Sequence, residues 1–400
     1  MKSLVFIGFS EALSAPEAAW SLVDAGFSVL VFARKGRHSA LRHSAHVELI
    51  EITPPELDAE AALADMEKAL AARNPAPGCL GVIFPLDDTA LWLCNRLKPT
   101  SGWILVGASG AAAELALDKR LQIETAQSAG FNVLPTTIAN TATEVLDRGH
   151  ELPLILRPAQ AVLPRDGRLQ KGSNWICATR AELDRAVSQW AGAWPLLVQP
   201  FASGRGEGVF GLATEAGVRG WSAHRRLRMM NPHGSGSSAC ASQPIAPETK
   251  ALVEKFIQLT GWRGLFMVEL LRDQSGKLWF VEFNGRPWGS LALARRQGLE
   301  YPAWAVNLAL NPSARIDLRP PDEKRVVCRN AGREFMHLLF VLRGPKSQAL
   351  REWPSFWRTA LELLRVRRND FFYNWRRDDL PVFFCDWWYT VRDNVCKSKG

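Results

Sequence analysis

The sequence predicts an α/β protein in three consecutive parts: an N-terminal parallel α/β domain over residues 1–107, a two-part α+β region over 108–312, and a helical C-terminal region over 313–400. Three observations support this division. The chain opens with a strand–helix–strand pattern, changes to paired strands after about residue 108, and ends in a basic, aromatic stretch with helical apolar spacing. A strand–helix–strand unit implies a parallel sheet with a right-handed crossover.

The N-terminal part alternates apolar runs with helical patterns. Residues 4–9 and 27–33 are short apolar runs that predict strands, and residues 16–25 between them have helical spacing. Asp58 is placed to cap a helix over residues 59–73. Two further strands are expected at 81–85 and 104–106.

Asp87 and Asp88 follow the strand at 81–85. Ligands of parallel sheets bind beyond the carboxyl ends of the strands, so both residues are candidates to line a site. An ordinary helix cap by Asp explains the same pattern equally well.

The middle region mixes helices with short strands. Helices are expected at 111–130, 179–190, 247–260 and 288–297. Strands are expected at 135–139, 153–157, 195–199, 210–214, 220–229, 264–271 and 277–283, with a Gly/Ser loop at 233–238.

The C-terminal region is expected to form helices at 335–342, 353–367 and 387–395. It is basic, with 16 Lys and Arg against 10 Asp and Glu over residues 322–400, out of a net charge of +9 for the chain. The aromatic segments 371–377 and 383–389, with Arg nearby, suit a weak peripheral contact with a membrane. Packing of these aromatic residues against the core is the favoured alternative, because Asp378, Asp379 and Asp386 lie among them.

Composition and motifs exclude several classes. The seven cysteines are scattered, without the spacing of a zinc site, which suits a reducing compartment and a cytoplasmic location. No uncharged apolar run reaches about 18 residues, and the N-terminus predicts a strand rather than a signal peptide. Phosphate-binding P-loop, dinucleotide-binding, zinc-protease and nucleophile-elbow motifs are absent.

The most informative stretch is a predicted hairpin that carries Glu269 on one strand and Glu282 and Asn284 on the next. Period-two alternation puts Glu282 and Asn284 on one face, and a hairpin can lay Glu269 beside them. Two carboxylates and an amide oxygen form a magnesium site when phosphates complete the shell. An ordinary hairpin with solvated Glu is the alternative, but the strands are otherwise strongly apolar and Asn is disfavoured within strands.

A Glu followed thirteen positions later by Glu-x-Asn-x-Arg resembles the metal and catalytic signature of the ATP-grasp superfamily. The adjoining Trp288-Gly289-Ser290 looks like the carbamoyl-phosphate-synthetase-like, carboxylate–amine ligase branch. The resemblance extends over about residues 5–310.

The resemblance implies specific roles. Glu269, Glu282 and Asn284 would hold Mg²⁺, with Mn²⁺ as an alternative ion, and Arg286 would act in catalysis on the transferred phosphoryl group. The residues implied to bind ATP are Lys119, Arg157, Gln199, Phe201, Glu207, Arg225 and Arg226. The resemblance also implies a hinge near 199–203 between the two halves of the region 108–312. One departure is Arg157, where the family usually has lysine; a guanidinium is longer and planar, so the exchange is not neutral.

The expected function is an ADP-forming ligase that joins a small-molecule carboxylate to an amine or related nucleophile through an acyl phosphate. A kinase or carboxylase, or a nucleotide-binding protein with weakened turnover, is the alternative. Nucleic-acid binding has only the basic tail in its favour and is not expected.

Overall fold

The computed structural model describes residues 3–73, 75, 79–98, 102–146, 151–234, 236–314, 316, 325–345 and 353–397. The helices are α1 (Ala15–Asp24), the 3₁₀ helix η1 (Ala40–His43), α2 (Ala59–Ala71), α3 (Asp88–Cys94), α4 (Ala111–Leu117), α5 (Lys119–Ala129), α6 (Ala142–Leu146), α7 (Arg180–Trp190), α8 (Pro247–Thr260), α9 (Leu291–Arg295), α10 (Tyr301–Leu310), α11 (Ala331–Arg343), α12 (Phe356–Leu364) and α13 (Leu380–Lys397). The strands are β1 (Leu4–Gly8), β2 (Ser28–Arg34), β3 (Glu48–Ile52), β4 (Gly81–Pro85), β5 (Trp103–Leu105), β6 (Asn132–Val133), β7 (Thr137–Ala139), β8 (Leu154–Pro158), β9 (Leu163–Arg165), β10 (Arg168–Gln170), β11 (Trp175–Cys177), β12 (Leu196–Pro200), β13 (Arg205–Thr214), β14 (Gly217–Met229), β15 (Ser237–Ser242), β16 (Gly264–Arg272), β17 (Leu278–Asn284), β18 (Val327–Arg329) and β19 (Asp370–Phe372).

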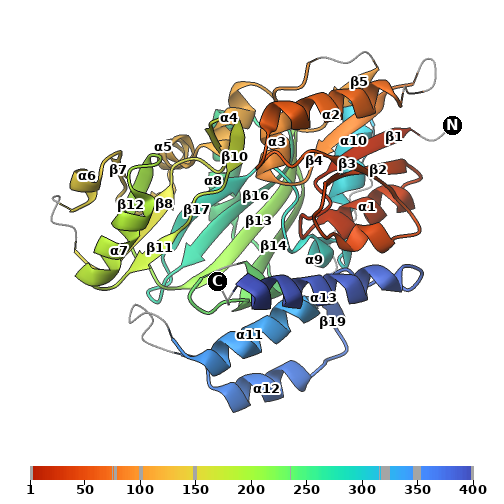
Figure 1. Ribbon diagram of the computed structural model, residues 1–400. Coiled ribbons are helices and arrows are strands. Elements are labelled where there is room, and N and C mark those ends of the chain that lie inside the picture. Colours follow the sequence, from red (N-terminus) through yellow and green to blue (C-terminus); the bar gives the residue numbers. More distant parts are fainter. Residues whose placement is uncertain are drawn as a thin grey trace.

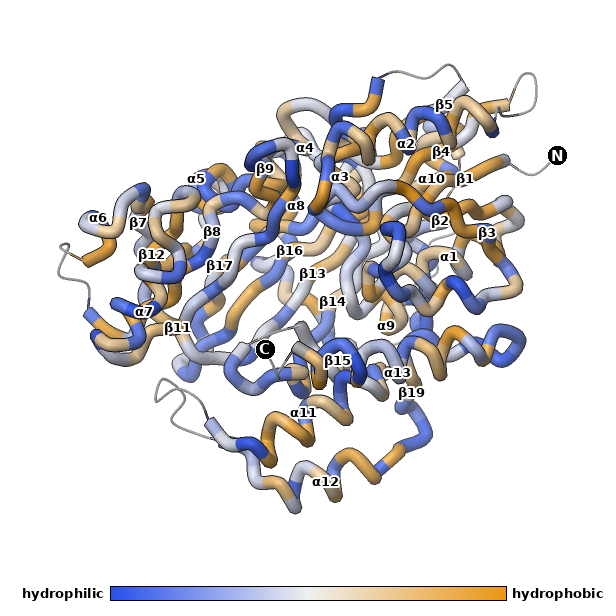
Figure 2. The backbone as a smooth tube through the Cα atoms, viewed as in Figure 1, coloured by the Kyte–Doolittle hydropathy of each residue, from blue (hydrophilic) through white to orange (hydrophobic). Residues whose placement is uncertain are grey.

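The N-terminal part is a parallel sheet in the order β3-β2-β1-β4-β5 (Figure 1). Its central strands are hydrophobic throughout, as Figure 2 shows for β1, β2 and β4, because both faces of the sheet are covered. Val5 and Ile7 pack in one core cluster with α1, and Phe6 packs on the other side with α2 and α3. The predicted α/β class is confirmed.

The middle of the chain builds two further sheets. The smaller one, in the order β11-β8-β12-β7, is antiparallel and has one face covered by α6 and α7. The larger one runs β19-β18-β15-β14-β13-β16-β17-β6, and α5 and α8 pack against one of its faces. A short hairpin, β9–β10, does not pair with either of these sheets. It is hydrogen-bonded instead to the segment around Pro55 and Ala59.

The C-terminal region adds strands as well as helices. β18 pairs antiparallel with β15, and β19 pairs parallel with β18, so residues from the tail extend the large sheet. In Figure 1, α11, α12 and α13 lie below this sheet. Helix α13 also packs against η1 of the N-terminal part. The tail is therefore part of the same body as the rest of the described chain.

The helix expected over 111–130 is two helices in the structure. Asp118 lies at the break, where its carboxylate accepts hydrogen bonds from the backbone amides of Arg120 and Leu121 and so caps α5. An Asp cap competes with helix continuation because its side chain replaces the missing intrahelical partners of the first turn. The break places Lys119 at the first position of α5.

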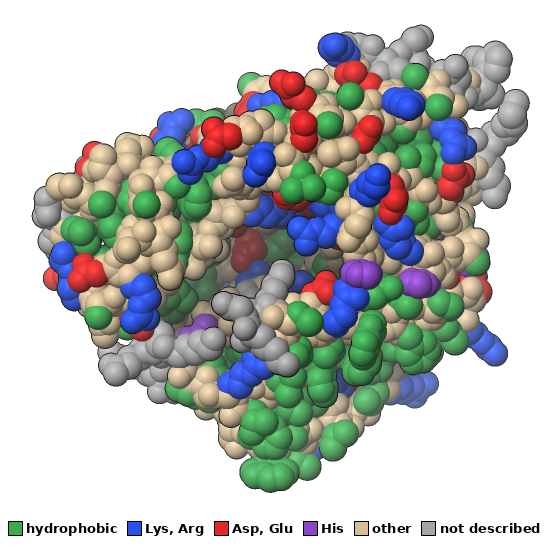
Figure 3. Space-filling model, in the orientation of Figure 1, with side chains coloured by type: hydrophobic (Ala, Val, Ile, Leu, Met, Phe, Trp, Pro, Cys, Tyr) green, Lys and Arg blue, Asp and Glu red, His purple; other side chains and the backbone are tan. Residues whose placement is uncertain are grey.

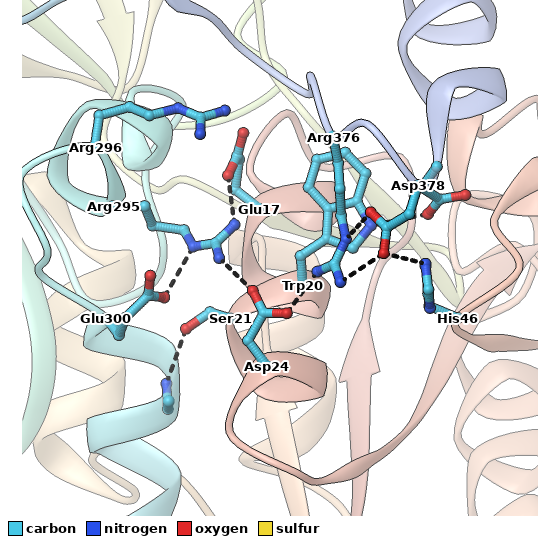
Figure 4. A network of polar contacts seen from close by, with 12 residues as sticks. Glu17, Trp20, Ser21, Asp24, His46, Arg295, Arg296, Glu300, Arg376 and Asp378 are labelled. Atoms are coloured by element: carbon cyan, nitrogen blue, oxygen red, sulfur yellow. Dashed lines mark hydrogen bonds and ion pairs between the residues drawn. The ribbon is translucent and has the colours of Figure 1, made fainter.

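A buried ionic network fastens α1 to α9, α10 and the C-terminal region (Figure 4). Arg295 bridges three carboxylates, donating to Glu17 at 2.7 Å, Asp24 at 3.0 Å and Glu300 at 2.8 Å. Glu17 also accepts a 3.0 Å hydrogen bond from the backbone amide of Asn374. Arg295 thus joins α1 to the segment between α9 and α10, and Glu17 joins α1 to the C-terminal region.

We expect Arg295→Gln to lower the free energy of unfolding by about 3–5 kcal/mol, because it leaves the buried Glu17 carboxylate without its cation. Chemical denaturation followed by tryptophan fluorescence measures the loss. The neighbouring Arg296 is exposed, donates to the backbone carbonyl of Trp375 and lies 5.5 Å from the centre of the Phe371 ring. Arg296→Gln is therefore the matched control and should cost less than about 1 kcal/mol. Equal losses in the two variants would contradict this account of the network.

Candidate functional site

The structure places Glu269 of β16 directly opposite Glu282 of β17. Asn284 pairs with Met267 two positions along, so Asn284 and both carboxylates share one face of the large sheet. A β-bulge follows the carboxylate pair, since Leu270 faces Phe280 and Val281 is the extra residue. The bulge turns Phe280 into the core on the opposite face while Glu282 stays beside Glu269.

The segment after Asn284 is positioned by close packing. Gly285 lies against the buried ring of Trp262, and a Cβ atom at this position would come within 2.2 Å of that ring. The main chain can therefore pass the ring only with glycine here. Asn284 itself is buried.

Two cations from other elements converge on Glu282. Lys119 Nζ, at the start of α5, lies 3.5 Å from one carboxylate oxygen, and an Arg157 amino group, on β8, lies 3.2 Å from the other. Burial alone would raise the pKa of Glu282, but the charges of Lys119 and Arg157 outweigh it and lower that pKa. Glu282 is therefore held ionised between the two sheets.

Glu269 has its own cation. Arg226 of β14 donates a 2.6 Å hydrogen bond to Glu269, and the charge of Glu269 raises the pKa of Arg226. The guanidinium must cross the intervening strand β13 to reach Glu269, and Gly206 of β13 leaves the room: a Cβ there would come within 2.7 Å of Arg226 Cδ.

Arg286 ties the site to the N-terminal sheet. Its guanidinium makes a bidentate pair with Asp88, with distances of 2.7 and 3.0 Å. Burial would raise the pKa of Asp88, but Arg286 outweighs it by charge and hydrogen bonding and lowers that pKa to about 2. Asp87 next to it caps α3 by accepting a hydrogen bond from the backbone amide of Ala90. Of the two roles that the sequence left open, Asp87 therefore takes the helix cap and Asp88 the contact with the site.

The residues predicted to form a hinge lie at the end of β12. Gln199 is on the same face of the smaller sheet as Arg157, opposite to the face that α7 covers, and it donates to Thr136 Oγ1 at 2.8 Å. The backbone amide of Phe201 donates to the carbonyl of Pro153. A cavity of about 340 Å³ adjoins this hinge and is lined by residues that include Pro153, Gln199 and Phe201.

Two residues predicted for the nucleotide lie elsewhere. Glu207 and Arg225 pair with each other across β13 and β14, on the face of the sheet opposite to Glu269. There Glu207 accepts hydrogen bonds from Arg272 at 2.8 and 3.0 Å and from Arg205 at 2.9 Å. The structure does not bring these two residues together with the carboxylate pair, and their contacts with a nucleotide stay a prediction.

Arg228 and the predicted Gly/Ser loop that follows it do not join the carboxylate pair as one group in the described residues. Arg228 donates to Glu334 at 2.8 Å and is thus engaged with the C-terminal region, and Ser235 of the predicted Gly/Ser loop lies outside the described residues.

The donor set fits a hard divalent cation only together with phosphate oxygens. Among the described residues, no group of three or more His, Cys, Asp and Glu side chains forms a metal site. Glu269, Glu282 and Asn284 supply two carboxylates and one amide, which is fewer ligands than Mg²⁺ requires. The nearby Lys119, Arg157 and Arg286 are suited to hold phosphate groups that would complete the shell.

Sequence reasoning missed one residue, Lys171, and one pairing, that of Asp88 with Arg286. Lys171 follows β10, and its charge is one of those that lower the pKa of Asp88. Asp88 itself was a candidate only by its place after a strand, and no local pattern could reveal that it would meet Arg286, 198 positions later. Figure 3 shows a hollow on this face of the molecule, with acidic and basic side chains on its walls.

Comparisons with known proteins identify the fold. No protein-family model matches the chain, and no curated protein matches its sequence. Among solved structures, L-amino acid ligase from Bacillus licheniformis is similar with a TM-score of 0.61 and 16% identity, over 82% of this chain and 79% of that one. N5-carboxyaminoimidazole synthetase from Staphylococcus aureus has a TM-score of 0.58 and 16% identity, over 83% of each chain. The biotin carboxylase domain of Hydrogenobacter thermophilus 2-oxoglutarate carboxylase, in complex with MgADP, ADP and bicarbonate, has a TM-score of 0.60 and 15% identity, over 82% of this chain and 74% of that one.

Asp88 generates a prediction about acid stability. Because its pKa is about 2 in the folded protein and 3.8 ordinarily, its pairing with Arg286 stabilises the fold above about pH 4 and is lost as the pH falls toward 2. The unfolding free energies of the wild type and Asp88→Asn should therefore converge by about 2 kcal/mol between about pH 5 and pH 2. Urea denaturation across this range measures the difference.

The control is Asp184→Asn, which changes an exposed carboxylate on α7 that pairs with Arg180. The difference between its free energy of unfolding and that of the wild type should change by less than about 0.5 kcal/mol over the same pH range. A wild-type advantage over Asp88→Asn that stays constant down to pH 2 would show that the pair does not hold Asp88 ionised.

Proposed function

We propose that this chain, which has the ATP-grasp fold, is an ADP-forming ligase that joins a small-molecule carboxylate to an amine or related nucleophile. The observation that carries the proposal is the juxtaposition of Glu269, Glu282 and Asn284 on one face with Lys119 and Arg157 opposite them. Oxygen ligands for Mg²⁺ beside cations for phosphates are what a site for Mg-ATP requires.

The residues around the site suit phosphoryl transfer to a carboxylate. Lys119 and Arg157 would exchange their contacts with Glu282 for contacts with the ATP phosphates. Glu282 and Glu269 would then be free to ligate Mg²⁺ with Asn284. Bound magnesium would neutralise charge on the phosphates. The purine would lie at the hinge near Gln199 and Phe201, where the adjoining cavity of about 340 Å³ offers room for a base.

Arg286 would stabilise the phosphoryl group during its transfer from ATP to the carboxylate. In the proposed reaction a carboxylate oxygen attacks the γ-phosphorus and ADP leaves. The nucleophile then attacks the acyl carbon, the bond to phosphate breaks, and inorganic phosphate departs. A planar guanidinium can contact two phosphoryl oxygens at once, and Asp88 holds it in place by the bidentate pair. No covalent enzyme intermediate is needed.

The proposal is tested by a screen of amino acids, sugar acids and amines for substrate-dependent release of ADP in the presence of Mg²⁺. Bicarbonate is included because one structural neighbour holds bicarbonate beside MgADP and is a carboxylase. ADP release that needs both an organic acid and an amine supports the ligase. Release that needs only bicarbonate or only an alcohol identifies a carboxylase or a kinase, and nucleotide binding without release identifies a binding protein.

We expect Glu282→Gln to reduce Mg²⁺-dependent ADP release by more than about 100-fold, because a neutral amide is a much weaker ligand for Mg²⁺. The fold should persist, since the carboxylate faces the cleft between two sheets rather than a core, and far-UV circular dichroism checks this. Glu254→Gln, at an exposed position on α8, is the control and should retain full activity. Full Mg²⁺-dependent activity in Glu282→Gln would overturn the metal assignment.

We expect Arg286→Ala to reduce turnover by about 100-fold or more while MgADP affinity changes less than about fivefold, because the contacts of Arg286 strengthen mainly in the transition state. Single-turnover rates and equilibrium dialysis measure the two quantities separately. Arg180→Ala, on the exposed surface of α7, controls for loss of positive charge. An equal loss of affinity and turnover would instead assign Arg286 to ground-state nucleotide binding.

A further inference from the structure

Helix α12 presents a hydrophobic face directly to solvent. Trp357, Leu361 and Leu364 recur at the spacing of one helix face, and their exposed fractions are 76%, 58% and 80%. The opposite face carries the buried Thr359 and the half-buried Leu363 and packs toward α11. The helix is therefore amphipathic with its apolar side turned outward, which is the reverse of a helix that serves the core.

The exposed apolar surface continues onto neighbouring elements of the tail. Of the fifteen large hydrophobic side chains that are exposed among the described residues, eleven lie between Phe335 and Trp388. They include Leu342 on α11 and Phe384 and Trp388 on α13. Figure 3 shows hydrophobic side chains covering much of the lower part of this face, where Figure 1 places α11, α12 and α13. A patch of this kind marks a surface that meets something other than water.

Positive charge surrounds the outward face of α12. Residues 353–368 contain four arginines, Arg358, Arg365, Arg367 and Arg368, and Glu362 as the single acid. Beside the C-terminal end of the helix lies a cavity of about 290 Å³ whose lining includes Arg325, Arg365 and Arg367. Arg228 and Arg329 also line it but are paired with Glu334, and Glu362 and Asp370 are the acids in its wall. The occupant of the apolar face should therefore carry negative charge at its border.

We propose that the surface formed by α11, α12 and α13, led by Trp357, Leu361 and Leu364, docks on an anionic lipid membrane. A short helix with Trp and Leu on one side and Arg at its flanks lies in the plane of the headgroups, with the apolar side chains at the acyl boundary and Arg near lipid phosphates. The contact is peripheral. Within the described part of the chain, no helix has the length and apolar character to cross a membrane.

Charge argues against a second copy as the occupant. A symmetric dimer through α12 would bring the arginines of one copy against those of the other, with a single acid in the segment to offset them. The surface is a helix exposed along its outward side rather than a groove, so it offers no concave seat for a peptide. A flat anionic surface satisfies both the apolar stripe and its basic border.

The proposed lipid contact is centred on α12 and includes only part of the aromatic segments that suggested it in the sequence. Tyr373 and Asn374 are buried, and Arg376 donates to Asp24 and Asp378 within the protein. Packing therefore accounts for the middle of the segment 371–377, whereas Phe371 and Trp375 on either side are 36% and 42% exposed. Phe384 and Trp388 of the second segment are exposed, but the most exposed apolar side chains of the tail are on α12.

Flotation with vesicles tests the proposal. The purified full chain is mixed at low salt with vesicles of phosphatidylcholine alone or with about 30% phosphatidylglycerol, a content that makes the surface strongly anionic. The wild type should float with the anionic vesicles at least about tenfold more than with the neutral ones, and added salt should reduce this binding. The triple variant Trp357→Ser/Leu361→Ser/Leu364→Ser should lose at least about tenfold of the partitioning. These side chains are exposed, so its circular dichroism and thermal midpoint should match the wild type.

Two controls make the result specific. Leu57→Ser/Leu259→Ser removes exposed leucines from other elements and should leave flotation unchanged. Arg367→Gln/Arg368→Gln should weaken binding to anionic vesicles only. Absence of wild-type flotation with anionic vesicles at low salt overturns the proposal, as does equal flotation of the wild type and the triple variant. A wild-type dimer in light scattering that the triple variant converts to monomer would assign the surface to a second copy instead.

Discussion

Two carboxylates on neighbouring strands, Glu269 and Glu282, set an electrostatic condition that the rest of the site meets. Side by side on one sheet face, they would repel each other and resist burial, so each must have a cation close by. The structure supplies these cations from separate elements: Arg226 from β14, Lys119 from α5 and Arg157 from β8. The last two come from outside the large sheet. The ion pair between Arg157 and Glu282 therefore connects the smaller sheet to the larger one across the site.

The same logic extends to the N-terminal sheet. Asp88 stands at the carboxyl end of β4, where ligands of parallel sheets bind, and its bidentate partner Arg286 follows β17. The pairing brings a third structural unit to the cleft and orients the guanidinium before any substrate arrives. The pairs of Glu282 with Arg157 and of Arg286 with Asp88 join the large sheet to the smaller sheet and to the N-terminal part, whereas the Arg226–Glu269 pair lies within the large sheet. Binding of an anionic phosphate chain with a divalent cation would replace these pairs with equivalent contacts, so the groups are preorganised for exchange.

The sequence predicted those features that depend on local pattern. The α/β class, the hairpin of Glu269 and Glu282, and the shared face of Glu282 and Asn284 follow from apolar alternation and turn residues. Features that depend on distant partners escaped it. The bulge at Val281, the helix break at Asp118 and the opposite orientation of Glu207 each depend on register against a strand or on a cap that competes with helix continuation. The tail strands β18 and β19 are three residues each and carry no period of their own, so only the edge of the large sheet defines them.

The tail serves the fold on its inner side, which explains why its outer side is free for another role. Asp379 accepts hydrogen bonds from Trp20 at 2.9 Å and from the amide of Ala45 at 3.2 Å, and the Arg329–Glu334 pair is buried at 2.6 Å. These contacts hold β18, α11 and α13 in place, and α12 is joined to them at its C-terminal end, where Arg329 donates to the backbone carbonyls of Leu363 and Arg365. With nine residues, α12 is shorter than the roughly 12–15 that an isolated helix needs to be stable in water, and it buries little besides Thr359. Its exposed Trp357 and Leu364 add nothing to that stability while they face water. A surface that covers them would stabilise the helix as it binds, so the helical state of α12 and its docking are expected to be coupled.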